Sequence, residues 1–169
     1  MNTQNPIVLC LGGFDSIHKG HKFLIETANS EKKKFGAESA VFTYCNQFGK
    51  KQEGLVFTYE ERLTRIENCG VNEVLVASFT SEFSNLSPEE FLNKLIKNHN
   101  ICAFVCGKDF KFGKKALGTV ELLADFCNKN KIPLTVCDFA LNENGEKIST
   151  STIKELLSNG NINGVNKLL

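Results

Sequence analysis

Short apolar runs alternate with longer segments of mixed polarity along the 169-residue chain. The runs are rich in β-branched, aromatic or cysteine side chains, which is typical of strands buried on both faces. Between them lie stretches with an apolar residue every three or four positions, and these predict helices. We predict five strands, at residues 7–11, 40–44, 71–77, 101–106 and 133–137.

Capping and breaking residues mark the helix boundaries. Gly36 is expected to end a first helix, and Gly70 a second one that begins at the capping box of residues 58–61. A third helix is indicated twice at residues 87–90, by a capping box and by a proline at the first helical position. A fourth follows through residues 120–126, and a last one begins near residue 149.

Strands and helices that alternate at short intervals indicate βαβ units. We therefore predict an α/β fold, with a five-stranded, mainly parallel sheet and helices on both faces, in a single domain over residues 1–169. Ligands of such sheets bind at the carboxyl ends of the strands. The turn after residue 11, the loop at 45–54, the turn at 107 and the segment before the last helix should meet at that edge.

The overall charge gives no sign of a polyanionic partner. Twenty basic residues oppose 19 acidic ones, so we expect neither nucleic acid nor a membrane surface as a partner. The apolar content of 41% is ordinary for a globular protein, and no apolar run approaches the length of a membrane span. The oligomeric state is left open by the sequence.

The seven cysteines form no C-x-x-C pair and show no zinc-like spacing with a histidine. Most fall in apolar, strand-like runs, where cysteine behaves as a small buried hydrophobe. Residues 1–6 lack the basic start and apolar core of a signal peptide. We therefore expect a cytoplasmic protein with reduced thiols.

The most informative stretch is Gly12 to His21, GGFDSIHKGH, which follows the first apolar run and leads into the first helix. The first N–H groups of a helix lack intrahelical partners and carry positive partial charge, so a strand, a glycine turn and a helix start can hold a phosphate. His18 and His21 are three residues apart on the first helical turn and share a face. The alternative is a tight turn with two surface histidines, which the flanking strand and paired glycines disfavour.

This spacing resembles the HxGH signature of the nucleotidyltransferase superfamily. Members of that superfamily attack the α-phosphorus of a nucleoside triphosphate and release pyrophosphate. The resemblance implies a Rossmann-like nucleotidyltransferase fold, in which His18 and His21 contact the triphosphate and act in catalysis. It also places Gly12, Gly13, Phe14 and Asp15 along the path of the adenosine and the phosphates.

A second stretch, KISTSTIKELL at residues 147–157, gathers hydroxyl groups at the start of a helix. In isolation such a cluster is usually only a helix cap. It also resembles the I-S-S-T-x-I-R motif that closes over the triphosphate opposite the histidines in the same superfamily. The resemblance implies that Ser149, Thr150 and Ser151 bind phosphate and that Lys154, in place of the usual arginine, contributes to binding and catalysis.

A third stretch, residues 105–118, places two phenylalanines between polar residues and glycines, VCGKDFKFGKKALG. Such a loop can offer an apolar wall to an aromatic ring, or its phenylalanines can fold back into the core. It resembles the flavin-binding region of the FMN adenylyltransferase module of bacterial bifunctional FAD synthetases, as does SPEEF at residues 87–91. The resemblance implies flavin contacts from four residues, of which Phe112 is favoured for ring packing: Gly107, Asp109, Phe110 and Phe112.

The reaction implied by this resemblance joins ATP and FMN into FAD and pyrophosphate, with Mg²⁺ accompanying the ATP. The sequence shows no dedicated magnesium ligands, and Asp15 is equally explained by turn formation. Residues 43–48 lack the family's usual T-F-x-P-H-P segment, which leaves the substrate mouth undefined. The chain also stops where the family's riboflavin kinase domain would begin, so we expect that domain to be absent.

Two other kinds of protein fit parts of this pattern. A pantetheine-phosphate adenylyltransferase or a glycerol-3-phosphate cytidylyltransferase typically carries a lysine at the position of Lys154, but neither explains FKFG and SPEEF. A flavin or nucleotide binding module without catalysis would explain the missing P-H-P segment. Retention of both histidines argues against that last alternative.

Overall fold

A computed structural model describes residues 5–45 and 56–169, and its centre is a sheet of five parallel strands in the order β3-β2-β1-β4-β5. The strands are β1 (Ile7–Leu11), β2 (Glu38–Tyr44), β3 (Glu73–Ala77), β4 (Ile101–Gly107) and β5 (Leu134–Cys137). The predicted α/β fold is confirmed, and the sheet is parallel throughout rather than mainly. Because β1 pairs with β2 on one side and with β4 on the other, the turn that follows it lies at the middle of the sheet.

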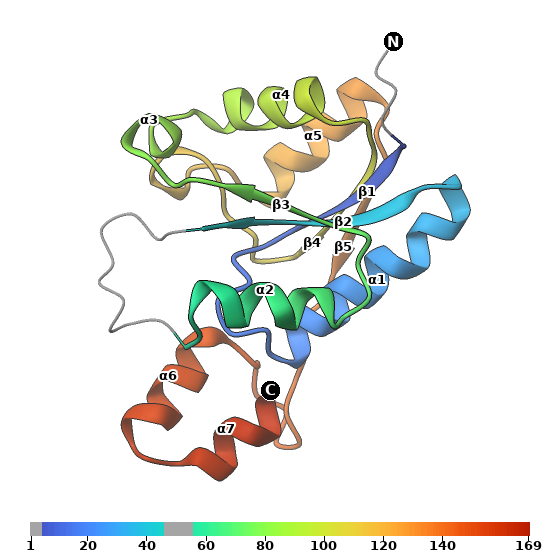
Figure 1. The fold of residues 1–169 in the computed structure, drawn as a ribbon. Helices are drawn as coiled ribbons and strands as arrows, with labels where there is room; N and C mark the ends of the chain where they lie inside the picture. Colours follow the sequence, from blue (N-terminus) through green and yellow to red (C-terminus); the bar gives the residue numbers. More distant parts are fainter. Residues whose placement is uncertain (1–4, 46–55) are drawn as a thin grey trace.

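Helices cover both faces of the sheet (Figure 1). The helices α1 (Lys19–Phe35) and α2 (Tyr59–Glu67) lie on one face, and α4 (Pro88–Asn98) and α5 (Val120–Asn130) lie on the other. Successive residues of a strand point to opposite faces, so β1 contributes to two cores. Leu9 and Leu11 pack with Leu92 and Leu123, whereas Val8 and Cys10 pack on the side of α1 and α2.

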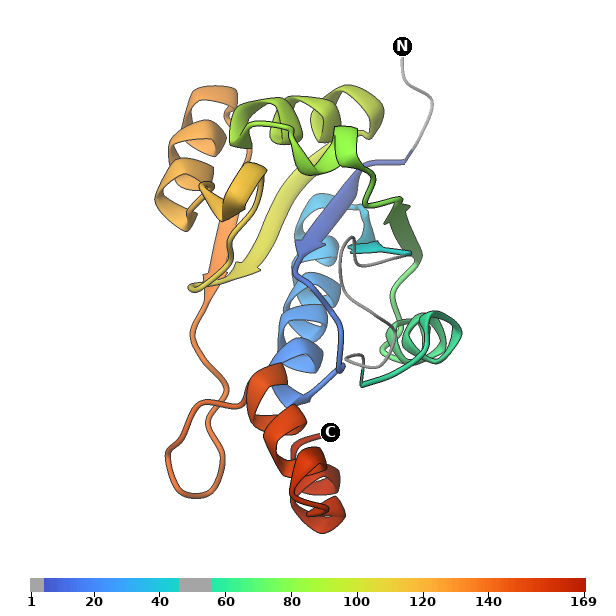
Figure 2. The same ribbon diagram turned by 90° about the vertical axis from the view of Figure 1, so that its left-hand side faces the viewer.

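The last two helices stand apart from the sheet. α6 (Thr150–Ser158) and α7 (Ile162–Leu168) pack together through their own apolar cluster, which contains Ile148, Ile153 and Val165. Figures 1 and 2 show this pair beyond the carboxyl ends of the strands, next to the hairpin that follows β5. None of the helices among residues 5–45 and 56–169 is long and apolar enough to span a membrane.

The capping signals are confirmed at three helices. Gly36 ends α1 in the left-handed region with φ of 56°, and the two capping boxes at Thr58 and Ser87 are both formed. α2 ends earlier than predicted, at Glu67 with Asn68 as its C-cap residue, and Gly70 lies in the turn beyond it. Strand β2 begins two residues before the predicted start, and β3 two residues after it.

Three short elements were not predicted. They are α3 (Ser81–Ser84), the 3₁₀ turn η2 (Lys114–Ala116) and α7. Each is too short for a hydrophobic period to be recognised. The predicted loop at 45–54 falls outside the described residues except for Cys45.

Candidate functional site

The turn between β1 and α1 is held in an unusual backbone conformation by its own buried side chains. Phe14 and Ile17 have φ of 49° and 42°, in the region that side chains other than glycine rarely adopt. Both side chains are buried against the core on the α1 side of the sheet. Backbone strain of this kind persists only where the surrounding packing enforces it, so the shape of the turn is fixed by the core.

The two histidines of this turn are arranged by the start of α1. His18 is the N-cap residue, and its Nδ1 accepts a hydrogen bond from the main-chain N–H of His21 at 3.1 Å. The two rings stack with centroids 3.8 Å apart. Gly20 makes this possible, because a Cβ there would lie 3.0 Å from the His18 ring. The glycine of the HxGH motif therefore leaves room for the first histidine.

Both histidines are neutral at pH 7. Burial lowers the pKa of His18 to about 4. Burial also lowers the pKa of His21 well below its usual value, and the neighbouring His18 lowers it further. Because Nδ1 of His18 accepts a hydrogen bond, its single proton resides on Nε2, which makes that atom a neutral donor.

A cavity of about 340 Å³ opens beside the histidines at the carboxyl ends of the strands. Its walls come from the turn after β1, the turn after β4, the segment after β5 and the start of α6. Nine of the predicted site residues line it: Gly12, Gly13, His18, His21, Gly107, Asp109, Phe110, Ser149 and Thr150. Three sequence stretches that were predicted separately therefore meet at one site.

The other five predicted residues do not line this cavity. Phe14 is part of the core, and Ser151 is exposed on α6. Phe112 is also a core residue, only 4% exposed, and Phe110 stacks on it with ring centroids 5.4 Å apart. Of the two phenylalanines, Phe110 is thus the one that faces the cavity, although Phe112 was favoured from the sequence.

Asp15 and Lys154 are paired with each other. The Lys154 Nζ lies 3.0 Å from Asp15 Oδ2, and the aspartate side chain is 10% exposed. Next to Asp15, and one helical turn before Lys154, Ser16 Oγ and Thr150 Oγ1 are 2.9 Å apart, although these residues are 134 positions apart in sequence. The turn after β1 is therefore joined to α6 by side-chain contacts.

The start of α6 combines a cap with a wall of the cavity. Ser149 is the N-cap residue, and its Oγ accepts a hydrogen bond from the N–H of Thr152 at 3.2 Å. Ser149 and Thr150 both line the cavity. The capping interpretation and the phosphate-site interpretation of this stretch are therefore compatible.

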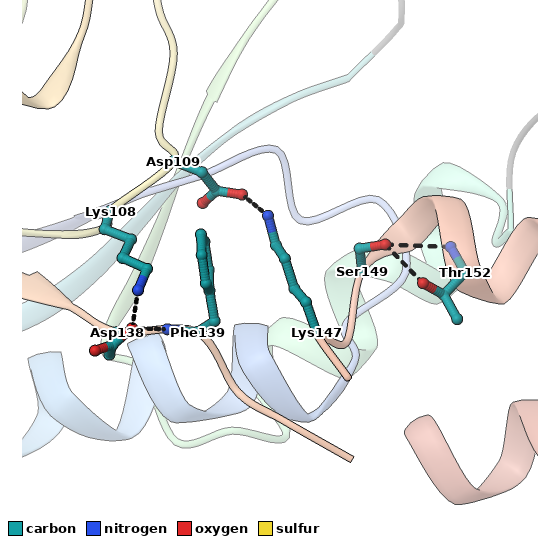
Figure 3. A network of polar contacts seen from close by, with 7 residues as sticks. All are labelled: Lys108, Asp109, Asp138, Phe139, Lys147, Ser149 and Thr152. Carbon is teal, nitrogen blue, oxygen red and sulfur yellow. Dashed lines mark hydrogen bonds and ion pairs between the residues drawn. The ribbon is translucent and has the colours of Figure 1, made fainter. Parts of the chain in front are cut away.

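A charged cluster around Phe139 was not predicted, and most of its residues line the cavity (Figure 3). Lys108 pairs with Asp138, and Lys147 pairs with Asp109. Both lysine Nζ atoms lie 4.0 Å from the centre of the Phe139 ring, which stands between the two side chains in Figure 3. The paired residues are 30 and 38 positions apart, so no local pattern announces the cluster.

The chemistry available at the cavity is that of hydrogen-bond donors and side-chain charges. Within residues 5–45 and 56–169, no group of three or more His, Cys, Asp or Glu side chains is placed to hold a metal ion. The two carboxylates at the wall, Asp109 and Asp138, are each bound to a lysine. The arrangement offers hydrogen-bond donors to the oxygens of a phosphorylated ligand.

The family to which the chain belongs follows from comparison with known proteins. Residues 1–152 match the family described as FAD synthetase. The chain belongs to the FAD synthetase family. The matched region of the FAD synthetase family includes both histidines, the turn after β4 and the first residues of α6, and it stops two residues before Lys154.

Curated relatives from the same family cover nearly the whole chain. An FAD synthetase of Listeria monocytogenes is 33% identical over 96% of this chain and 68% of its own length. A bifunctional riboflavin kinase/FMN adenylyltransferase of Bacillus subtilis is 33% identical over 98% of this chain. The chain spans 54% of the length of that Bacillus protein.

A solved structure confirms the fold independently. The crystal structure described as a macrolide-efflux protein from Streptococcus pneumoniae superimposes with a TM-score of 0.86 and 28% identity. The match covers 99% of this chain and 56% of that one. The sheet and helices described above are therefore an arrangement known from experiment.

Proposed function

We propose that this chain is an FMN adenylyltransferase, which transfers AMP from ATP to FMN and releases pyrophosphate with FAD. Membership of the FAD synthetase family supports the proposal, as do the names of the relatives. The observation that carries it is the single cavity that combines the stacked histidines, the start of α6 and Phe110. The proposal treats residues 1–169 as one nucleotidyltransferase unit.

The reaction needs no nucleophile from the protein, because the FMN phosphate is already an anion. Its oxygen attacks the α-phosphorus of ATP in line with the leaving pyrophosphate. The protein contributes positioning and stabilisation of developing charge. His18 and His21, as neutral donors, would bond the phosphoryl oxygens, together with the free N–H groups at the start of α1.

The remaining cavity residues divide between the two substrates. Ser149 and Thr150 would hold the β- and γ-phosphates at the start of α6, with Gly12 and Gly13 along the nucleotide. Gly107, Asp109 and Phe110 would contact FMN, with the Phe110 ring against the flavin. Mg²⁺ would arrive on the triphosphate and keep most of its waters, since the described residues offer it no dedicated ligand set.

The experiment that tests this function is a chromatogram of ATP, FMN and Mg²⁺ incubated with the pure protein. FAD and pyrophosphate should form in equal amounts. Parallel incubations with ATP and phosphopantetheine, and with CTP and glycerol 3-phosphate, address the related transferases. A product in one of these, without FAD in the first, would overturn the proposal. FMN binding without release of pyrophosphate would instead indicate a binding module.

The His21→Ala variant tests the catalytic role of the cradle. Loss of a donor that acts in the transition state should reduce FAD formation by more than about tenfold while the fold survives. The control is His99→Ala, since His99 lies at the end of α4, away from the cavity. Unchanged kinetics of the His21 variant would remove this residue from the mechanism.

A further inference from the structure

The turn after β1 is attached to α6 by two contacts of different chemistry. Asp15 forms an ion pair with Lys154 at 3.0 Å, and Ser16 shares a hydrogen bond with Thr150 at 2.9 Å. Asp15 and Ser16 are buried. Charges removed from water interact more strongly than exposed ones, and a buried charge that loses its partner is costly.

These contacts matter because α6 belongs to a separate apolar cluster. Ile153 packs with Val165 and Leu168 of α7, outside the two clusters that flank the sheet. The histidines belong to the sheet side of the cavity, and Ser149 and Thr150 belong to the α6 side. The distance between these two walls therefore depends on how α6 is attached to the turn.

Lys154 is poorly placed to bind phosphate directly. It does not line the cavity, and its Nζ is held by the aspartate of the turn. Asp15 also attracts the buried guanidinium of Arg62, on α2, so it lies between cations from two helices. The pair thus links the histidine turn with α6 behind the cavity wall.

We propose that Lys154 is a positioning residue that acts through Asp15. Their ion pair sets the start of α6 against the turn after β1, so that Ser149 and Thr150 face the histidines across one triphosphate. This inference rests on the proposed nucleotidyl transfer for its meaning, but it concerns ATP binding and is independent of the acceptor. A small misplacement of such walls is enough to lower turnover substantially.

The test compares four variants: Asp15→Asn, Lys154→Met, the double variant and Lys154→Arg. MgATP binding is measured by calorimetry, FAD formation by chromatography and folding by circular dichroism with thermal unfolding. The matched control is Lys129→Met, which removes an exposed charge from α5. If Lys154→Met does not fold, Asp15→Asn and the double variant still test the positioning role. The double variant removes both charges, so it leaves neither residue as an unpaired charge at this site.

A positioning role predicts that Asp15→Asn and Lys154→Met each weaken MgATP binding by about tenfold or more, and that the double variant is no worse than the single ones. Lys154→Arg should retain most of the binding, because arginine can also pair with the aspartate. A direct phosphate contact predicts the opposite for Asp15→Asn, since a released lysine would bind MgATP equally well or more tightly. That result would overturn the proposal.

The two proposals fail in different ways. Wild-type protein that binds MgATP but forms no FAD would overturn the proposed acceptor and leave the binding comparison to judge the ion pair. Additive losses in the double variant would show that the two residues act separately and would overturn the positioning role alone. Wild-type protein without affinity for MgATP would overturn both.

Discussion

At the scale of single residues, the HxGH motif supplies hydrogen-bond donors and also meets packing requirements of the turn. His18 caps the helix with one ring nitrogen and keeps the other as a donor, and Gly20 leaves space for its ring. The spacing of the motif in the sequence singled out these residues. It could not predict that both imidazoles are neutral, because burial depends on Phe14 and on the segment after β5, which approaches from far along the chain.

The lowered pKa of His18 predicts a pH-dependent stability. The unfolded ring, with an ordinary pKa near 6.5, binds a proton that the folded ring does not accept until about pH 4. Stability contributed by neutral His18 is therefore complete above about pH 6.5 and is lost as the pH falls towards 4, by up to about 3 kcal/mol.

The variant that isolates this effect is His18→Asn, because asparagine can accept the same capping hydrogen bond but does not titrate. Urea unfolding at pH 7 and pH 4.5 should show a smaller pH dependence in the variant than in the wild type. FAD formation should fall by more than about tenfold, since the Nε2–H donor is lost. Equal pH dependence in both proteins would contradict the assignment.

At the scale of elements, predictions succeeded where the signal was local. The capping boxes at Thr58 and Ser87 need only four residues to form, and both are present. The choice between Phe110 and Phe112 was different, because residues two apart in an extended segment point to the same side, so alternation does not distinguish them. Gly118 makes Phe112 the buried ring of the two. A Cβ at position 118 would lie 2.7 Å from the Phe112 ring, so only glycine leaves room for that ring.

The two phenylalanines should therefore respond differently to truncation. Phe112→Ala removes a buried core side chain and should lower the free energy of unfolding by about 3–5 kcal/mol. Phe110→Ala should cost less stability but raise the KM for FMN by about tenfold, through loss of an aromatic surface. Denaturation and steady-state kinetics on both variants provide the check, and a raised KM in neither variant would remove this turn from the flavin site.

At the scale of the whole molecule, the site is assembled from segments that the sheet brings together. The alternation of strands and helices predicted the sheet and the edge at which the loops meet. The order β3-β2-β1-β4-β5 and the pairing of Lys108, Asp109 and Asp15 with distant partners come from tertiary packing, which no local pattern contains. Both charged pairs around Phe139 were consequently missed.

Because the site joins the sheet to α6, a bound nucleotide should stabilise the entire fold. MgATP at about one hundred times its Kd should add about 2.7 kcal/mol, which corresponds to a rise in Tm of about 5–10 °C for a chain of this size. Differential scanning calorimetry with increasing MgATP measures this shift. His21→Ala should show a smaller rise at the same concentration, and an unchanged Tm in the wild type would argue against a nucleotide site.

The distance in sequence between the two halves of the site also has a consequence during biosynthesis. α6 follows the histidine turn by about 130 residues. At about 5–20 residues per second, a ribosome needs roughly 7–26 seconds to make that stretch. During this time β1 can pair with β2, but no complete triphosphate site exists. Cellular ATP can therefore stabilise only the finished fold by binding to it. The first half of the chain must be stabilised by its own packing as it emerges.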